Sequence, residues 1–373
     1  MTDMNVQFAG LSFPNPLVLA PGPPSKSCAY VKRAVDAGVG GVVFKTAVPD
    51  SLGMTRKYPR PRYKLLGDRN DFWLYSCEQS YHGTLDEYFG ELAKAKLDGD
   101  VPIFASFLAT EIGEWTELCR RAEDIDVDGI ELDISCPHSA EGMESFEEVV
   151  GACAEAVKLP IVPKLAMTPD VVDYVRRAGS AGAAGATLCN RMSALDLDID
   201  EGRPIMHRSH AGFGGPWSKY FVFKTVADVA SQTDMPISAT GGISGWQDVV
   251  KYLMLGASTV QVCSHVMLKG YGLISEILAG LRDYMDSHNT SPMELRGSAL
   301  SHLLPPDGIE REPEIHFEVD PSRCNACGRC ETVCFFDAVT IEEVSLIDPS
   351  SCDGCGLCAE VCAQGAIRLA SGT

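Results

Sequence analysis

Residues 17–24 read Leu17-Val18-Leu19-Ala20-Pro21-Gly22-Pro23-Pro24, a short apolar strand followed by a turn rich in proline. An open sheet that binds dinucleotides carries a glycine-rich fingerprint directly after its first strand, and this turn does not match it. Seven similar apolar runs follow, each ending in polar or glycine residues. Together the predicted strands are Leu17–Ala20, Gly41–Lys45, Pro102–Ser106, Gly129–Asp133, Ile161–Leu165, Ala186–Asn190, Ile237–Thr240 and Thr259–Cys263.

Amphipathic helical stretches separate these runs. They are Tyr30–Ala37, Trp115–Glu123, Phe146–Val157, Pro169–Ala178, Tyr220–Ser231, Gln247–Leu255 and Gly272–Asp286. Eight strands that alternate with helices predict an α/β chain with a (β/α)₈ TIM barrel, and the alternative is an open doubly wound sheet. Because the turn after the first strand does not match the dinucleotide fingerprint, we favour the barrel over the open sheet.

The connection after the second strand is unusually long, from about Thr46 to Asp100. Loops of this size within a compact domain are usually functional, so we expect it to cover the site or to build a subunit interface in a homo-oligomer. We place the barrel at residues 1–290 and a linker rich in Pro, Ser, Gly and charge at 291–314. A small α+β, bacterial-ferredoxin-like domain is expected at 315–373.

The C-terminal segment carries two runs of four cysteines with the spacing C-x₂-C-x₂-C-x₃-C, and the second run starts 28 residues after the first. This spacing is typical of ligands to two [4Fe–4S] clusters, in which the fourth cysteine of each run binds the other cluster. One predicted set is therefore Cys324, Cys327, Cys330 and Cys362, and the other is Cys352, Cys355, Cys358 and Cys334. The alternatives are disulfides or structural zinc, but zinc sites usually lack the third closely spaced thiolate. The proline that commonly follows the fourth cysteine is replaced by Phe335 and Ala363.

The composition excludes several classes of protein. A formal charge of −20 argues against binding to nucleic acid, because phosphates are neutralised by a basic surface. No apolar run is as long as a membrane-spanning helix, and the N-terminus has no signal-peptide pattern. Fifteen cysteines without such a signal point to a reducing, cytoplasmic environment.

Chemistry in a TIM barrel lies at the carboxyl ends of the strands, and phosphate often binds after strands seven and eight. Gly241 and Gly242 follow strand seven, where their backbone N–H groups could approach a phosphate, although a plain tight turn is the alternative. Gly214 and Gly215, after strand six, are placed for a similar approach. Lys45 and Lys164 end two other strands. A lysine in an apolar strand is rarely without an anionic partner, so they indicate either structural ion pairs or a cofactor that becomes anionic on reduction, as a flavin does at N1/O2.

Strand four continues into the loop Ser135-Cys136-Pro137-His138. A thiol carried over a bound substrate could act as a general acid or base. The alternative is a small buried residue, which is what most lone cysteines are. We interpret His138 as a polar loop residue without a catalytic part.

Several of these segments together resemble the FMN barrel of the dihydroorotate dehydrogenases. They are Ser135-Cys136-Pro137-His138, Lys45-Thr46, Lys164, Ala239-Thr240-Gly241-Gly242 and Gln261-Val262-Cys263-Ser264. The resemblance looks closest to the FMN domain of the dihydropyrimidine dehydrogenases, which is also followed by a two-cluster ferredoxin domain, and it covers almost the whole chain.

The resemblance implies FMN on the barrel and a role for each matching residue. Its phosphate would lie at Gly241, Gly242, Cys263 and Ser264, and its ring near Ala20, Pro21, Gly22, Lys45, Thr46, Ser106 and Lys164. Cys136 would transfer the proton opposite flavin N5, with Lys45 also assigned to catalysis. Asn190 is assigned to both cofactor and substrate, and Ser135 to the substrate.

The substrate side departs from the family pattern. Asp133 stands where the family has a substrate-binding asparagine, and Asn190-Arg191 replaces an Asn-Thr pair. The polar residues with which the family grips a pyrimidine have no clear equivalents in the segment 71–78. Because a site built to hydrogen-bond one ring discriminates against others, we expect Asp133 and Arg191 to bind a different substrate.

We therefore predict an FMN and iron–sulfur oxidoreductase that acts on an activated C–C bond of a small molecule. The substrate is expected to be a conjugated, anionic compound rather than a standard pyrimidine. Two alternatives stay open: a true dihydropyrimidine or dihydroorotate dehydrogenase, and an electron-transfer subunit without chemistry on the barrel. Electrons should pass through the clusters to or from a ferredoxin or an NAD(P)H-dependent flavoprotein, because the chain has no second nucleotide-binding domain.

Overall fold

The computed structural model describes residues 2–49, 51, 62–68, 71–77, 80–98, 100–134, 146–206, 210–304 and 315–370. The chain divides into two compact units, Met1–Leu303 and Leu304–Thr373. The first unit extends beyond residue 290, where we expected the barrel to end. Helix α11 (Pro292–Leu295) and the 3-10 turn η4 (Leu300–His302) belong to it. Two backbone N–H groups fasten this segment to the end of α8: Gly297 donates to Leu253 O at 2.9 Å and Ala299 to Met254 O at 3.0 Å.

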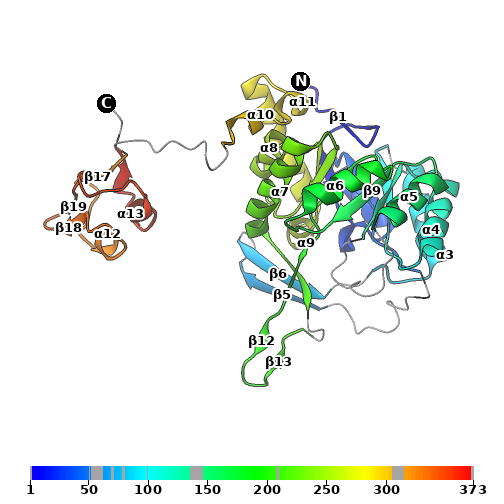
Figure 1. Ribbon diagram of the computed structural model, residues 1–373, viewed down its shortest axis with the longest axis horizontal. Helices are drawn as coiled ribbons and strands as arrows, with labels where there is room; N and C mark the ends of the chain where they lie inside the picture. The colour runs from blue at the N-terminus through cyan, green and yellow to red at the C-terminus, as the bar shows by residue number, and fades with distance from the viewer. Residues whose placement is uncertain are drawn as a thin grey trace. The chain divides into compact units, whose positions relative to one another are not determined.

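The first unit contains a closed barrel of eight parallel strands (Figure 1). In chain order the strands are β3 (Leu17–Leu19), β4 (Gly41–Val43), β7 (Ile103–Phe107), β8 (Gly129–Leu132), β9 (Ile161–Leu165), β10 (Ala186–Leu188), β15 (Ile237–Thr240) and β16 (Thr259–Val262). The barrel closes because β16 pairs with β3, and β9 pairs with β10. Every strand predicted from the sequence is present, and the TIM-barrel prediction is confirmed.

Helices surround the barrel (Figure 1). They are α1 (Cys28–Asp36), α3 (Leu85–Asp98), α4 (Ile112–Asp124), α5 (Phe146–Ala156), α6 (Val171–Ser180), α7 (Lys219–Gln232), α8 (Trp246–Met254) and α10 (Gly272–His288), with the short α9 (Ser264–Lys269) before the last. Seven of them match predicted helices. Helix α3 lies within the segment that we expected to be a loop, and it buries Tyr88, Phe89 and Leu92.

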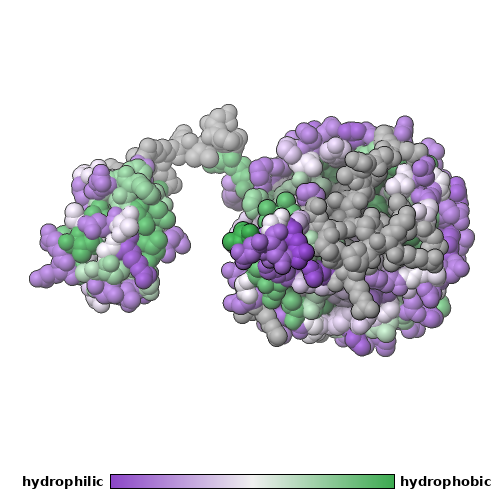
Figure 2. All heavy atoms as spheres, turned by 90° about the horizontal axis from the view of Figure 1, so that it is seen from below, coloured by the Kyte–Doolittle hydropathy of each residue, from purple (hydrophilic) through white to green (hydrophobic). Residues whose placement is uncertain are grey.

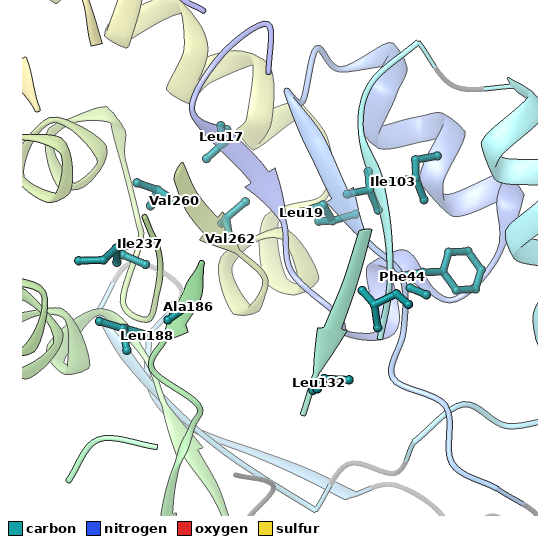
Figure 3. Packing of buried hydrophobic residues seen from close by; sticks show 14 of the residues in the cluster. Leu17, Leu19, Phe44, Ile103, Leu132, Ala186, Leu188, Ile237, Val260 and Val262 are labelled. Atoms are coloured by element: carbon teal, nitrogen blue, oxygen red, sulfur yellow. The ribbon is translucent and has the colours of Figure 1, made fainter. Parts of the chain in front are cut away.

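Alternate residues of each strand face the helices, as the two-residue period of a strand requires. Leu17 and Leu19 of β3 and Val260 and Val262 of β16 are buried in this way (Figure 3). The intervening positions face the inside of the barrel. At the amino-terminal end of the strands, the hairpin β1 (Val6–Phe8) and β2 (Leu11–Phe13) joins an inner cluster with Phe104.

Beyond the strand ends, a four-stranded sheet joins segments that are far apart in the sequence. Its order is β11 (Met192–Ala194), β14 (Ala211–Gly214), β6 (Phe72–Cys77) and β5 (Arg62–Gly67). A small hairpin, β12 (Leu197–Asp198) with β13 (Arg203–Pro204), extends from the same region (Figure 1). The long second connection is therefore not one loop. It contributes two sheet strands and helix α3.

The second unit is built from two similar halves. Strand β17 (Phe317–Val319) pairs with β20 (Ile367–Leu369), and β18 (Val339–Ile341) pairs with β19 (Ser345–Ile347). Helices α12 (Arg329–Thr332) and α13 (Leu357–Glu360) start 28 residues apart, like the two cysteine runs. Hydrophobic residues gather on the visible face of this unit, the smaller body in Figure 2.

Candidate active site and cluster ligands

One pocket, with about 900 Å³ of space that includes open solvent, lies at the carboxyl ends of the barrel strands. It brings together many of the predicted site residues. They are Ala20, Lys164, Asn190, Arg191, Gly214, Gly215, Gly241, Gly242, Cys263 and Ser264. Because these residues lie in or after five different barrel strands, the closed barrel is what places them around one space.

Two glycines in this region have no room for a side chain. A Cβ atom on Gly242 would lie 2.5 Å from the backbone nitrogen of Lys219, and its φ of +70° also disfavours other residues. A Cβ atom on Gly22 would lie 2.4 Å from Sγ of Cys263. The backbone therefore makes close approaches at both positions, and at Gly242 this occurs in the wall of the pocket.

Lys164, in the wall of the pocket, forms a buried ion pair. Its Nζ lies 3.3 Å from Oε1 of Glu131, and both side chains are more than nine-tenths buried. Glu131 also accepts hydrogen bonds from Thr187 at 2.8 Å and from Gln261 at 2.9 Å. Burial by itself lowers the pKa of Lys164, but Glu131 and Asp133 outweigh it, so the net shift is upward. The lysine is a fixed positive charge at the pocket wall.

A second group of predicted residues meets next to the pocket rather than in its lining. The hydroxyl of Thr46 lies 2.9 Å from that of Ser106 and 3.5 Å from Oδ2 of Asp133. The amide of Asn190 donates to Oδ1 of Asp133 at 2.7 Å, which connects this group to the pocket. Burial raises the pKa of Asp133, and the nearby Lys164 and Lys45 only partly counteract this. Lys45 is itself buried.

Arg191 lies in the pocket wall against the four-stranded sheet. Its guanidinium donates to the hydroxyl of Ser76, a fully buried residue of β6. It also packs over Gly212 of β14, where an added Cβ would lie 2.8 Å from the guanidinium carbon. Its backbone N–H donates to Oδ1 of Asn190 at 2.8 Å. These contacts fix both the backbone and the cation of Arg191 at the pocket.

The sequence did not predict several residues that line the same pocket, among them Phe72, Phe213 and His265. The rings of Phe72 and His265 meet edge to face with centroids 5.0 Å apart. Burial lowers the pKa of His265 to about 4, so its imidazole is neutral near pH 7. Phe72 and Phe213 come from the four-stranded sheet, and no local sequence signal placed that sheet over the barrel.

Other predicted residues either lie outside the described part of the chain or do not line the pocket. Ser135, Cys136 and His138 lie outside the described residues, so the proton-transfer assignment stays a prediction. Pro21 and Gly22 do not line the pocket, although Gly22 contacts Cys263 of the lining.

In the second unit, two separate cavities are lined by cysteines from both runs. One is lined by Cys324, Cys327, Cys330 and Cys362, which we call the Cys324 set. The other is lined by Cys352, Cys355, Cys358 and Cys334, which we call the Cys352 set. In each set the fourth cysteine comes from the opposite run. This is the grouping that the sequence predicted.

Comparisons with known proteins agree with this architecture. The family described as dihydroorotate dehydrogenase matches residues 3–285, and the family described as 4Fe-4S binding domain matches residues 317–340 and 346–368. The chain is 29% identical over 358 residues to the NAD-dependent dihydropyrimidine dehydrogenase subunit PreA of Escherichia coli (strain K12), covering 89% of this chain and 85% of that protein. It is 32% identical over 311 residues to the dihydroorotate dehydrogenase B (NAD(+)) catalytic subunit of Pyrococcus abyssi, covering 80% of this chain and 99% of the relative. It is also 29% identical to the chloroplastic dihydropyrimidine dehydrogenase (NADP(+)) of Arabidopsis thaliana over 346 residues, 84% of this chain and 80% of that one.

Proposed function

Because the chain belongs to the dihydroorotate dehydrogenase family and continues into a 4Fe-4S binding domain, we propose that it acts on an anionic, conjugated substrate other than a standard pyrimidine. The chain is an iron–sulfur oxidoreductase that acts on CH–CH groups, as its relatives do. Its cofactors are FMN and two [4Fe–4S] clusters.

The residues that line the pocket are chemically suited to bind FMN. Gly241 and Gly242 offer backbone without side chains where the phosphate would lie, next to Ser264. Lys164 supplies a buried positive charge where the flavin ring would need one. When bound, FMN supplies hydride transfer at N5 and passes electrons on to the clusters one at a time.

The protein residues would position the substrate and move its proton. In this proposal Cys136 donates or removes the proton on one carbon of the reacting bond, and Lys45 is a second catalytic residue. Asn190 orients Asp133 through a 2.7 Å hydrogen bond. Ser135 and Asn190 complete the expected substrate contacts.

Arg191 carries the substrate proposal. Its guanidinium lines the pocket and is fixed by Ser76 and by the backbone of β14, so it presents a positive charge in one place. Guanidinium groups bind carboxylates and phosphates well because they offer several N–H donors in a plane. Asp133 adds a carboxylate where the family pattern has an amide. A carboxylate that is ionised can only accept hydrogen bonds, so it cannot reproduce both contacts of that amide.

The competing function is that of the named relatives, turnover of a dihydropyrimidine or of dihydroorotate. Their names favour it, because all three relatives described above act on pyrimidines. The exchanged polar residues favour a different substrate, since a site built for one hydrogen-bonding ring rejects others strongly.

Anaerobic reoxidation of the reduced flavin separates these functions. We expect uracil and thymine to reoxidise the reduced flavin poorly, and a conjugated carboxylate to reoxidise it faster. Dihydroorotate, which is already reduced, is tested in the opposite direction, and we expect it to reduce the oxidised flavin poorly. Arg191→Ala should raise KM for the true substrate by about 10-fold or more with unchanged flavin content, while Arg191→Lys, which keeps the charge, should lose less. Efficient turnover of a standard pyrimidine would establish the competing function. No turnover with any C–C substrate would leave an electron-transfer subunit.

We also propose an electron-transfer partner that docks on the second unit. Two of the relatives are named as subunits, which supports work with another protein. Among the described residues, no helix is long and apolar enough to cross a membrane. Phe335 and Leu357 are exposed and are sequence neighbours of Cys334 and Cys358, and exposed hydrophobic groups can mark binding surfaces. A ferredoxin or an NAD(P)H-dependent flavoprotein should therefore reduce the clusters more slowly in a Phe335→Ser variant.

A homo-oligomer stays part of this proposal. The hairpin β12–β13 and strand β6 expose Leu197, Ile199 and Trp73, and Ile199 is 91% exposed. Exposed hydrophobic groups of this size favour a subunit contact. Light scattering should give a mass above that of one chain, and Ile199→Asp should lower it. A monomer at micromolar concentration would contradict the proposal.

A further inference from the structure

The two cysteine sets offer a controlled comparison within one small unit. Each cysteine of the first run has a counterpart 28 residues later in the second run. Counterparts have the same degree of burial: Cys330 and Cys358 are buried, Cys327 and Cys355 are exposed, and the other four are intermediate. Differences between the sets therefore come from the surrounding residues rather than from different exposure of the thiols.

Hydrogen bonds to sulfur are unequally distributed between the two sets. The hydroxyl of Ser345 lies 3.2 Å from Sγ of Cys330, and the Ser345 N–H donates to Sγ of Cys324 at 3.3 Å. The N–H of Ala326 donates to Cys324 at 3.4 Å, and that of Ala366 donates to Cys362 at 3.3 Å. Within the described part of the second unit, these four bonds all reach the Cys324 set. In the Cys352 set, the backbone N–H of Ala359 contacts Cys358.

The residue that replaces Ser345 in the other half explains part of this difference. Residue 317 stands 28 positions before residue 345, and it is a phenylalanine. Phe317 lines the cavity of the Cys352 set, whereas Ser345 lines that of the Cys324 set. A serine that offers both O–H and N–H thus has an aromatic ring as its counterpart.

Other lining residues of the two cavities also differ in polarity and charge. Arg329 and Gln364 line the cavity of the Cys324 set. Asp353 and Phe336 line that of the Cys352 set. One cavity therefore has a nearby cation and an amide, while the other has a nearby carboxylate and a second aromatic ring.

We propose that the two clusters differ in reduction potential, and that the cluster held by the Cys324 set is the more easily reduced. Hydrogen bonds to cluster sulfurs and nearby positive charge stabilise the extra electron, and nearby negative charge destabilises it. Ser345 and Arg329 stabilise an extra electron on the cluster of the Cys324 set. Asp353 destabilises an extra electron on the cluster of the Cys352 set. At equilibrium a single electron in the unit resides on the cluster of the Cys324 set. This inference rests on the proposed ligand assignment of the eight cysteines, but not on the identity of the substrate.

A redox titration of the full-length holoprotein, followed by electron paramagnetic resonance, tests the inference. The wild type should show two separate one-electron steps. Ser345→Ala should lower the upper step, reducing the ratio of reduced to oxidised cluster about tenfold at a fixed potential, which corresponds to about 59 mV for a one-electron couple. The lower step should not move. Ser322→Ala is a matched control, because that hydroxyl donates to Asp320 and lies two residues before Cys324.

Two further variants keep the test decisive if Ser345→Ala loses a cluster. Arg329→Gln should lower the upper step, and Asp353→Asn should raise the lower one, so the two steps move closer in both variants. Iron content and signal intensity show whether both clusters are present, which tests the ligand assignment separately. A single unresolved step in the wild type, or a Ser345→Ala shift of the lower step, would overturn the proposal.

Discussion

Asp133 is a carboxylate held in the barrel mouth, where burial raises its pKa above the usual value of 3.8. A carboxyl group with a raised pKa binds its proton more tightly in the folded than in the unfolded state. Its ionised form therefore opposes folding at neutral pH, and this penalty disappears as the pH falls through the raised pKa and then below 3.8. We predict that Asp133→Asn increases the free energy of unfolding at pH 7.

Urea unfolding of the holoprotein at several pH values measures this effect. The advantage of Asp133→Asn over the wild type should shrink as the pH is lowered, because the wild-type carboxyl becomes neutral as well. A variant that is less stable at pH 7 by a margin independent of pH would show that the hydrogen bond from Asn190 matters more than the cost of the buried charge.

Cys136 lies outside the described residues, so its role depends on the sequence and on the family resemblance. Cys136→Ala should leave FMN bound and the clusters reducible, but slow the chemical step by about 10²–10⁴-fold, the usual contribution of a general acid or base. Cys136→Ser should keep part of the activity. Single-turnover rates that stay unchanged in the alanine variant would make this cysteine structural.

Individual residues were predictable where the sequence pattern itself carried the chemistry. Lys164 stood out because a lysine in an apolar strand needs a partner. Its partner Glu131 could not be identified, since any of several carboxylates could have reached it. His265 gave no signal, because a histidine after a strand is as often a plain packing residue. Burial decided its role as a neutral group, and burial depends on the folded chain.

At the scale of elements, the turn between β15 and α8 should be sensitive to any side chain. Gly242→Ala places a Cβ against the Lys219 nitrogen at a φ of +70°, a strain of about 1–3 kcal/mol. We predict that this variant loses most of its FMN, which flavin release and absorbance measure. Gly90→Ala in α3 is the matched control, because a Cβ there meets nothing within 4 Å. The control should keep its flavin and gain about 0.5–1 kcal/mol of stability. Full flavin content in Gly242→Ala would move the phosphate site elsewhere.

The strands of the barrel were predictable because each is a short apolar run bounded by turn residues. The four-stranded sheet was not, since β6 and β14 are paired across more than a hundred residues of sequence. Neither segment carries a pattern that identifies the other. Helix α3 was missed for a related reason: its apolar residues were read as part of a long loop, although Tyr88 and Leu92 are fully buried against the barrel.

For the whole molecule, the cofactor content gives a direct count. We predict roughly eight iron atoms and one FMN per chain after anaerobic purification. Zinc in place of iron, or FAD in place of FMN, would contradict the cofactors. Cys334→Ser should damage the cluster of the Cys352 set, and Cys362→Ser that of the Cys324 set. If each substitution instead damaged the cluster of its own run, the crossed grouping of the two cavities would be wrong.

The crossed grouping also determines when, during synthesis of the chain, each cluster has all four of its cysteine ligands. Cys324 emerges first but shares its cavity with Cys362, the last of the eight ligands to be synthesised. The Cys352 set needs Cys358, which precedes Cys362 by only four residues. Neither ligand set is therefore complete until Cys358 or Cys362, close to the end of the second cysteine run, has been synthesised. Both ligand sets therefore become complete within four residues of each other, and iron insertion follows the synthesis of the whole barrel sequence.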